Sequence, residues 1–208
     1  NKTNKMKKIK IPTIDKIKKG WEDFSDIYVS TLEVNSVKNT EYYFRVLTEK
    51  YMPSKTPLLL NPGSSVLEIA TGSGLFAEHL FRTNHSNIRD LHLMDLSSKM
   101  IHQANKRFEA ILEKEDFGFR VSAEFGGSPE KSIVIKEQNC EDLSNYPDDY
   151  FDVVFGNFVV HLTESPQKMV AEVKRVLKPG GFTIFSVLGD FRKSSFFWTY
   201  LDLFAEFG

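Results

Sequence analysis

The fold of this 208-residue chain is decided by Val66-Leu-Glu68-Ile-Ala70-Thr-Gly72-Ser-Gly74-Leu-Phe-Ala77. An apolar run that contains an acid leads into a glycine-rich turn, and a helical pattern follows. Glycine lets the backbone of such a turn approach a ligand closely, and the next helix points its N-terminus at the same place. The stretch therefore predicts a strand, a loop and a helix that bind a nucleotide-like cofactor.

Strand and helix patterns alternate along the rest of the chain. Strands are expected over residues 65–70, 90–95, 132–137, 151–156 and 182–188, and residues 116–131 are expected to form a loop. Helices are expected over residues 15–31, 35–51, 74–83, 97–114, 165–177 and 194–206. Alternating helices and near-continuous apolar strands predict an α/β fold with a doubly wound, mainly parallel sheet and helices on both faces. The ligand is then expected at the carboxyl ends of the strands, where the strand order reverses.

Composition and charge narrow the class of protein. The chain is 41% hydrophobic and 26% charged, which is ordinary for a globular protein, and its single cysteine favours a cytoplasmic setting. No apolar stretch approaches the roughly 20 residues of a membrane span. Residues 1–20 hold eight lysines and one aspartate. A polybasic arm that binds nucleic acid or anionic lipid, or that directs nuclear import, is one interpretation. The acidic remainder argues against a broad nucleic-acid surface and favours a solvated, partly disordered basic tail.

The domain organisation follows from these patterns. Residues 1–20 are expected to form the tail, residues 21–60 a helical lid or cap, and residues 61–208 the cofactor-binding domain. Trp21, Phe24 and Tyr28 recur at helical spacing and form an apolar stripe. Such a stripe is typical of ordinary core, and it also suits a lid that favours an apolar or aromatic acceptor.

The glycine loop alone does not decide the cofactor. Gly72-x-Gly74-x-x-Ala77, with Asp95 about 20 residues further on, fits the dinucleotide pattern and favours a nicotinamide enzyme. Glu68 argues against a dinucleotide cofactor, because a carboxylate so close to an anionic pyrophosphate would repel it. S-adenosylmethionine carries a sulfonium and an ammonium and no phosphate, so an acid beside the loop suits it better.

Three further segments after the loop have an order and spacing that are typical of one enzyme family. They are Asn139-Cys-Glu141-Asp142-Leu143, Phe151-Asp-Val-Val154 and Leu177-Lys-Pro-Gly-Gly181. With these segments the chain resembles the class I S-adenosylmethionine-dependent methyltransferases over residues 64–188. It is similar in particular to the small-molecule group that includes quinone and sterol methylating enzymes. The resemblance implies a Rossmann-like fold, S-adenosylmethionine as cofactor and methyl transfer to a small-molecule acceptor by in-line displacement.

The resemblance also implies roles for residues of the loop. Glu68 would fix the loop and lie near the methionine end of the cofactor, although a surface acid at a strand end is the alternative. Gly72 and Gly74 would let the backbone approach the cofactor. Ala70 stands where the family usually has its first glycine.

Further roles are implied at the ends of the next strands. Asp95 would accept hydrogen bonds from the ribose hydroxyls, with a helix-capping role as the alternative, and Leu96 would pack against the adenine. Asn139 stands where an acid usually binds the adenine amino group, and the backbone N–H of Cys140 would reach a ring nitrogen. The same two residues also fit an ordinary polar turn. Cys140 is not expected to be a nucleophile.

The segment after residue 156 is expected to line the mouth where the methyl group is transferred. Asn157 and Phe158 would form that mouth, and His161 is the candidate catalytic base. A structural histidine near the start of the next helix is the alternative for His161. No histidines, cysteines or acids stand at metal-ligand spacing, so no metal site is expected.

One departure from the family keeps other functions open. Members of the family finish the sheet with an antiparallel hairpin, and this sequence stops at Gly208 without one, so the hairpin is expected to be missing. The alternatives to a methyltransferase are a methyltransferase-like binding domain with weak or no turnover and an NAD(P)-dependent oxidoreductase. The acceptor, its reacting atom, the pathway and the oligomeric state are not indicated by the sequence.

Overall fold

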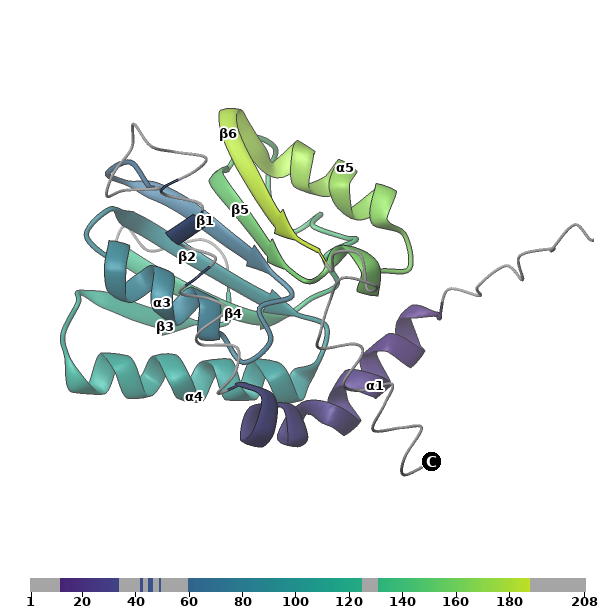
Figure 1. Cartoon of the computed structure of the whole chain (residues 1–208). Helices are drawn as coiled ribbons and strands as arrows, with labels where there is room; N and C mark the ends of the chain where they lie inside the picture. Colours follow the sequence, from purple (N-terminus) through teal and green to yellow (C-terminus); the bar gives the residue numbers. More distant parts are fainter. Residues whose placement is uncertain are drawn as a thin grey trace, which may run out of the picture.

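A twisted parallel sheet forms the centre of the computed structural model, which describes residues 12–33, 42, 45–46, 49, 60–124 and 131–187 (Figure 1). Its strands are β1 (Ser64–Ile69), β2 (Ile88–Asp95), β3 (Phe119–Ser122), β4 (Lys131–Glu137), β5 (Phe151–Asn157) and β6 (Leu177–Ser186). They lie side by side in the order β3-β4-β2-β1-β5-β6, and every pairing is parallel.

Helices lie on both faces of this sheet and across the carboxyl ends of its strands. They are α1 (Ile14–Ile27), the π-helix η1 (Tyr28–Leu32), α3 (Leu75–Asn84), α4 (Ser98–Lys114), the 3-10 turn η3 (Val160–Leu162) and α5 (Pro166–Val176). Helices α3 and α4 share one buried cluster with the sheet, and α5 contributes to a second cluster on the opposite face (Figure 1). None of the described helices combines the length and the apolar character needed to cross a membrane. The predicted doubly wound α/β fold is confirmed.

Burial on both faces explains why the strands are so apolar. All six residues of β1 are buried, because this strand lies between β2 and β5 with helices above and below. Burying a large apolar side chain contributes about 1.5–3 kcal/mol relative to leaving it exposed. The central strands therefore hold the sheet together, and the loops at their carboxyl ends are free to carry the site.

The order of the strands places that site. From β1 the chain passes to β2, then to the edge strand β3, and then back to β4, which lies between β3 and β2. It next crosses to the other side of β1 to form β5 and β6. The direction of winding reverses between β1 and β5. A crevice at such a reversal, at the carboxyl ends of the strands, is where open α/β sheets bind their ligands.

Two boundaries differ from the prediction. Residues 116–131 are expected to form a loop, but they contain β3. Only Phe119 of this strand is buried, so its sequence has no apolar run from which a strand could be predicted. Strand β6 begins at Leu177 and not at residue 182, because α5 passes directly into the strand and Leu177 already pairs with Phe151. The Lys-Pro-Gly-Gly turn is absorbed as a register shift at the start of β6.

The N-terminal prediction also needs a correction. Helix α1 begins at Ile14, so the expected boundary between tail and cap at residue 20 falls inside a helix. Ile14, Ile17, Trp21 and Phe24 give it an amphipathic pattern that continues without a break into η1. The described residues leave out residues 1–11, most of the helix expected over 35–51 and the helix expected over 194–206. The expectation about the C-terminal hairpin likewise concerns a part of the chain that the structure does not describe.

A buried histidine lies within the sheet, away from the glycine loop. His92 on β2 is 1% exposed; its Nε2 lies 3.7 Å from Asp90 Oδ1 and its Nδ1 lies 3.3 Å from the hydroxyl of Tyr146. Burial lowers the pKa of His92 to about 4. The negative charge of Asp90 raises this pKa, whereas the positive charges of Lys136 and Arg89 lower it further. His92 is therefore neutral in the folded protein at neutral pH.

We expect this histidine to destabilise the fold in mild acid. Between pH 6.5 and about 4 the unfolded chain binds a proton that the folded chain excludes, so stability falls as the pH falls. The full shift corresponds to about 3 kcal/mol. Urea unfolding from pH 7.5 to 4.5 should show this loss in the parent and a smaller one in His92→Gln. The exposed His102→Gln is the control, and an unchanged profile for His92→Gln would contradict the assignment.

Candidate active site

The loop between β1 and α3 is built from left-handed backbone. Gly72 and Gly74 have φ angles of 57° and 79°, and Ala70 has a φ of 52°. For a residue with a Cβ atom this conformation costs roughly 1–2 kcal/mol, so the position prefers glycine, as the family pattern does. A Cβ atom built on Gly72 would meet nothing within 4 Å, which leaves open space on the loop where a ligand can approach.

Glu68 fastens this loop from inside the sheet. Its side chain is buried, its Oε2 accepts a hydrogen bond from Thr71 Oγ1 at 2.6 Å, and it also accepts one from the backbone N–H of Ala77 on α3. Burial raises the pKa of Glu68 to about 8, and the negative charge of Asp95 adds to the rise. At neutral pH the site therefore holds a protonated acid that a nearby cation would convert to a carboxylate.

Asp95 joins the ends of β1 and β2. Its Oδ2 accepts the N–H of Gly72 at 2.9 Å, and its Oδ1 accepts the N–H of Ser97 at 2.9 Å. Burial raises the pKa of Asp95, although these hydrogen bonds oppose the rise. The cap of α4 comes from Ser97, whose Oγ accepts the N–H of Met100 at 3.3 Å. Leu96 lies beside them, half-buried.

The turn after β4 lies against the same place. The backbone N–H of Gln138 donates to the carbonyl of Asp95 at 2.9 Å, and Asn139 Oδ1 accepts the N–H of Glu141 at 2.9 Å within the turn. Burial raises the pKa of the Cys140 thiol to about 12, with the charges of Glu141 and Asp95 adding to it. The thiol stays protonated, which agrees with the expectation that Cys140 is no nucleophile.

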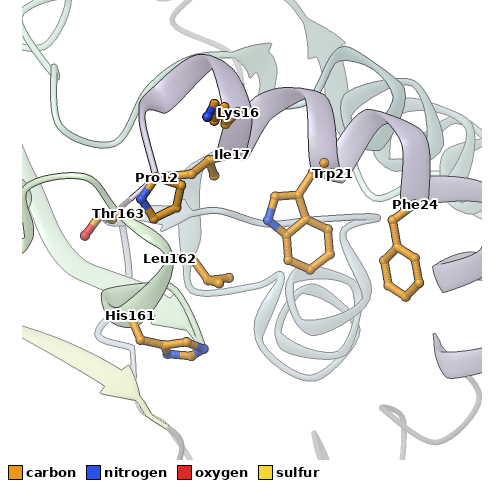
Figure 2. A pocket seen from close by; sticks show the side chains of 9 residues that line it. Pro12, Lys16, Ile17, Trp21, Phe24, His161, Leu162 and Thr163 are labelled. Atoms are coloured by element: carbon orange, nitrogen blue, oxygen red, sulfur yellow. The ribbon is translucent and has the colours of Figure 1, made fainter. Parts of the chain in front are cut away.

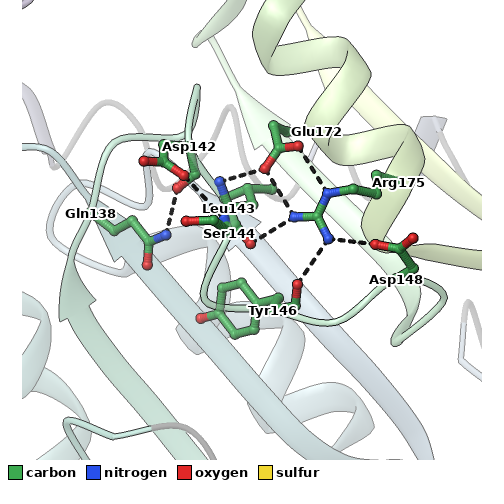
Figure 3. A network of polar contacts seen from close by, with 8 residues as sticks. All are labelled: Gln138, Asp142, Leu143, Ser144, Tyr146, Asp148, Glu172 and Arg175. Carbon is green, nitrogen blue, oxygen red and sulfur yellow. Dashed lines mark hydrogen bonds and ion pairs between the residues drawn. The ribbon is translucent and has the colours of Figure 1, made fainter.

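Arg175 on α5 holds the segment that follows this turn (Figure 3). Its guanidinium donates to the carbonyls of Leu143 and Tyr146, at 2.8 and 2.9 Å, and pairs with Glu172 at 2.9 Å and Asp148 at 2.7 Å. Glu172 in turn accepts the N–H of Leu143 at 2.8 Å. The network fixes the backbone from 143 to 148 and so supports the 139–142 turn from the side of α5.

The end of β5 carries a strained aromatic residue. Phe158 has a φ of 54° and is 41% exposed. Its N–H donates to the Oγ and the carbonyl of Ser186, at 2.9 and 3.1 Å, and Ser186 Oγ donates to Asn157 Oδ1. Ser186 at the end of β6 therefore holds both residues of the predicted mouth.

Residues 14–33, called here the N-terminal cap, lie across the loops at the carboxyl ends of the strands. The cap contacts four different loops or strand ends through polar groups, which belong to Ile14 with Glu164, Lys18 with Glu137, Glu22 with Ser98, and Glu33 with Ser73. Arg107 on α4 adds a fifth link. It donates to the carbonyl of Ser73 at 2.8 Å and to Glu78 at 2.6 Å, and it pairs with Glu33.

A pocket of about 280 Å³ opens between the cap and the segment after β5 (Figure 2). Ile17, Trp21 and Phe24 line it from α1, and His161, Leu162 and Thr163 line it from η3 and the residue beyond. Burial lowers the pKa of His161, so its imidazole is neutral at neutral pH. Two of the three residues of the apolar stripe predicted for the cap, Trp21 and Phe24, line this pocket, and Tyr28 does not.

The structure brings most of the predicted site residues into one place. Glu68, Ala70, Gly72, Gly74 and Asp95 form or directly contact the loop, and the Asn139–Cys140 turn is joined to Asp95 through Gln138. Three contributors escape sequence reasoning, namely Arg107, Glu33 and Ser186. An arginine on the polar face of a helix and a serine at a strand end have no pattern that separates them from ordinary surface residues.

The residues fit S-adenosylmethionine. Two buried acids lie beside an open glycine turn, and the cation that contacts the loop, Arg107, is already paired with Glu33 and Glu78. Two acids that a neighbouring cation can keep ionised suit a sulfonium and an ammonium, whereas a pyrophosphate would be repelled by either carboxylate. Within residues 12–33, 60–124 and 131–187, no three histidine, cysteine or acidic side chains converge in a way that could hold a metal ion.

Comparison with known proteins points the same way. Residues 67–185, more than half of the chain, match the family described as "Methyltransferase domain". A putative S-adenosyl-L-methionine-dependent methyltransferase from Methanococcus maripaludis has the same fold, with a TM-score of 0.54 at 20% identity over 88% of this chain and 67% of that chain. The resemblance to S-adenosylmethionine-dependent methyltransferases and the predicted cofactor are confirmed, while the quinone and sterol subgroup stays a prediction.

Two curated proteins that are similar in sequence to this chain are longer than it. The PKS-NRPS hybrid synthetase cheA of Chaetomium globosum is 29% identical over 129 residues, which are 62% of this chain and 2% of the relative. A malonyl-(acyl-carrier protein) O-methyltransferase of Marinomonas sp. is 26% identical over 151 residues, which are 70% of this chain and 46% of the relative. The chain thus spans less than half the length of either protein.

We expect Arg107 to support cofactor binding without touching the cofactor. Arg107→Gln removes the link from Ser73 to the cap, so the affinity for S-adenosylhomocysteine should fall roughly tenfold, or about 1.4 kcal/mol. Calorimetric titration measures the change. Arg82→Gln is the matched control, because Arg82 also pairs with Glu78, and among the described contacts none joins Arg82 to the loop. Equal affinities for both variants would contradict this role.

The raised pKa of Glu68 should couple cofactor binding to proton release. A bound sulfonium or ammonium favours the ionised carboxylate, so affinity for S-adenosylmethionine should rise as the pH rises toward about 8. Calorimetry in buffers of different ionisation enthalpy counts the protons released. Glu68→Gln separates this effect from titration of the ligand's own amino group, and equal proton release by the parent and Glu68→Gln would refute the coupling.

Proposed function

This chain belongs to the methyltransferase domain family, and we propose that it transfers a methyl group from S-adenosylmethionine to a small-molecule acceptor. The observation that carries the proposal is the pair of buried acids, Glu68 and Asp95, on either side of the glycine turn. Burying two acids together is unfavourable unless a ligand supplies positive charge or hydrogen-bond donors. A cofactor with two cationic groups and a ribose diol supplies both.

The proposed cofactor seat uses residues from three strand ends. Glu68 and the turn at Gly72 would lie at the methionine part, Asp95 would accept hydrogen bonds from the ribose, and the Asn139–Cys140 turn would border the adenine with Leu96. Asn157 and Phe158 would border the reacting methyl group. When bound, the cofactor supplies an electrophilic methyl group on a positively charged sulfur. The protein's own contribution is to position the acceptor beside it and to exclude water.

His161 is proposed as the base that accepts a proton from the acceptor. It follows β5 directly, it lines the pocket beneath the cap, and its lowered pKa keeps a ring nitrogen free to take a proton at neutral pH. The volume of the pocket, about 280 Å³, suits a small molecule or the end of a longer one. An acceptor held there would lie between the cap and the end of β5.

Calorimetry with two cofactors tests this function. The chain should bind S-adenosylhomocysteine and should show no comparable binding of NADH. Asp95→Asn should weaken S-adenosylhomocysteine at least tenfold, because it disturbs the ribose acceptor and the hold on Gly72. Tight NADH binding without S-adenosylhomocysteine binding would overturn the proposal.

A matched control separates this loss from a general loss of structure. Asp152 also accepts a backbone N–H, that of Ser65 at 2.9 Å, and it pairs with Lys178 at 2.7 Å. Both contacts lie at the opposite ends of β1 and β5 from the glycine loop. Asp152→Asn should therefore keep the affinity for S-adenosylhomocysteine even if it lowers the free energy of unfolding.

A further inference from the structure

We infer that the pocket between α1 and η3 takes an apolar, uncharged acceptor that presents a weakly acidic hydroxyl group, a phenol or an enol. The inference rests on the proposed methyl transfer and adds the chemical class of its acceptor. It follows from three properties of the pocket: an aromatic wall, two hydrogen-bonding groups that no other described residue occupies, and an absence of acids among the described lining residues.

The wall contributed by α1 is aromatic and preorganised. The rings of the lining residues Trp21 and Phe24 lie 6.1 Å apart, edge to face, and Tyr28 of η1 packs against Trp21 from outside the lining at 6.2 Å. Ile17 on the same helix and Leu162 on the opposite side extend the apolar surface (Figure 2). Such a surface binds a flat apolar molecule and offers few favourable contacts to a strongly hydrated polar molecule.

Two polar side chains belong to this lining, the half-buried Trp21 and the exposed His161. Figure 2 shows the indole nitrogen of Trp21 turned into the pocket from α1, and the imidazole of His161 on the other side. Among the described residues, none forms a hydrogen bond with the indole N–H of Trp21 or with a ring nitrogen of His161, so both groups can bind a ligand that displaces water. One donor and one acceptor are what a single hydroxyl group needs, because its oxygen accepts while its proton is donated.

The charges around the pocket exclude a cationic acceptor. Among the described lining residues none is acidic, and the titratable ones are Lys16 and His161. Glu164, the next residue after the lining, is engaged by the N–H of Ile14 at 3.0 Å. An ammonium group would therefore lose hydration without gaining a counter-charge, whereas a neutral hydroxyl loses little.

The pocket is also tied to the cofactor seat. The backbone N–H of Glu164 donates to Glu141 at 2.7 Å, and Glu141 belongs to the turn proposed to border the adenine. Through Ile14 the same residue holds the start of α1. The two walls of the pocket are thus fixed to each other and to the 139–142 turn.

The proton has a defined route in this arrangement. As the acceptor hydroxyl gives its proton to a ring nitrogen of His161, an electron pair of its oxygen forms the new bond to the methyl carbon. The electron pair of the broken carbon–sulfur bond stays on sulfur. The products are a methyl ether, S-adenosylhomocysteine and a protonated His161, which returns its proton to solvent. A phenol or enol suits this step because its hydroxyl is acidic enough for an imidazole to assist.

The experiment uses three matched probes on the full chain in the presence of S-adenosylhomocysteine. The probes are 4-butylphenol, 4-butylbenzylamine and butylbenzene, and binding is followed by ligand-observed NMR and calorimetry. We expect the phenol to bind at least tenfold more tightly than the cationic amine and than the hydrocarbon. Trp21→Phe, which keeps the ring and removes the N–H, should weaken the phenol several-fold and leave butylbenzene unchanged.

Turnover gives the second readout. With labelled S-adenosylmethionine, the parent should methylate the phenol and not the amine, and His161→Asn should lose at least tenfold in rate while still binding S-adenosylhomocysteine. His102→Asn, an exposed histidine on α4, is the control. Failure of the phenol to bind, equal binding of the amine, or a phenol affinity untouched by Trp21→Phe each overturns the acceptor assignment. Absence of S-adenosylhomocysteine binding would instead refute the proposed function itself, so the two failures are distinguishable.

Discussion

The arrangement of the site depends on the carboxylate of Asp95. One oxygen holds Gly72 in the loop after β1, the other holds Ser97 at the start of α4, and the residue's own carbonyl accepts the N–H of Gln138 after β4. A single residue thereby fixes the exits of three parallel strands against one another. Because Asp95 is buried beside a second acid, Glu68, its place in the fold is electrostatically unfavourable in the absence of a ligand. The site keeps an unfavourable charge arrangement that a suitable ligand relieves, as functional sites commonly do.

The N-terminal cap, residues 14–33, is also held by polar contacts with the loops at the ends of the strands. Its contacts reach Ser73 in the glycine loop, Ser98 at α4 and Glu164 beyond η3, so the cap touches both the proposed cofactor seat and the acceptor pocket. Arg107 reinforces the first of these contacts by binding the loop carbonyl and Glu33 together. A single ion pair exposed to solvent contributes little, but the largely shielded guanidinium of Arg107 binds three partners, Ser73, Glu78 and Glu33, and so holds its geometry more firmly. The cap therefore belongs to the site, and its aromatic face is positioned by polar contacts at its edge.

Sequence reasoning succeeds here where a pattern has a single physical cause. Glu68 and Asp95 stand out because an acid at the end of an apolar run contradicts burial, and the glycine turn between them explains the contradiction. Strand β3 escapes notice because only Phe119 is buried, and its pairing with β4 is made by the backbone. The start of β6 is misplaced because a Lys-Pro-Gly-Gly turn usually precedes a strand, whereas here it is a register shift within one. Arg107 and Ser186 act through partners distant in sequence, and no local periodicity records those partners.

The cofactor side and the acceptor side of the proposed site differ in their charged and titratable groups. The cofactor side is acidic, with Glu68 and Asp95 buried near each other, while the described lining of the acceptor pocket holds a neutral base and no acid. This division suits a reaction in which positive charge on sulfur disappears and a proton appears on His161. Once the sulfonium charge is gone, Glu68 would be left as a buried carboxylate, and with a pKa of about 8 it regains a proton at neutral pH. The raised pKa of Glu68 thus lets the site match its charge to the ligand before and after transfer, which a permanently ionised acid in the same position would not do.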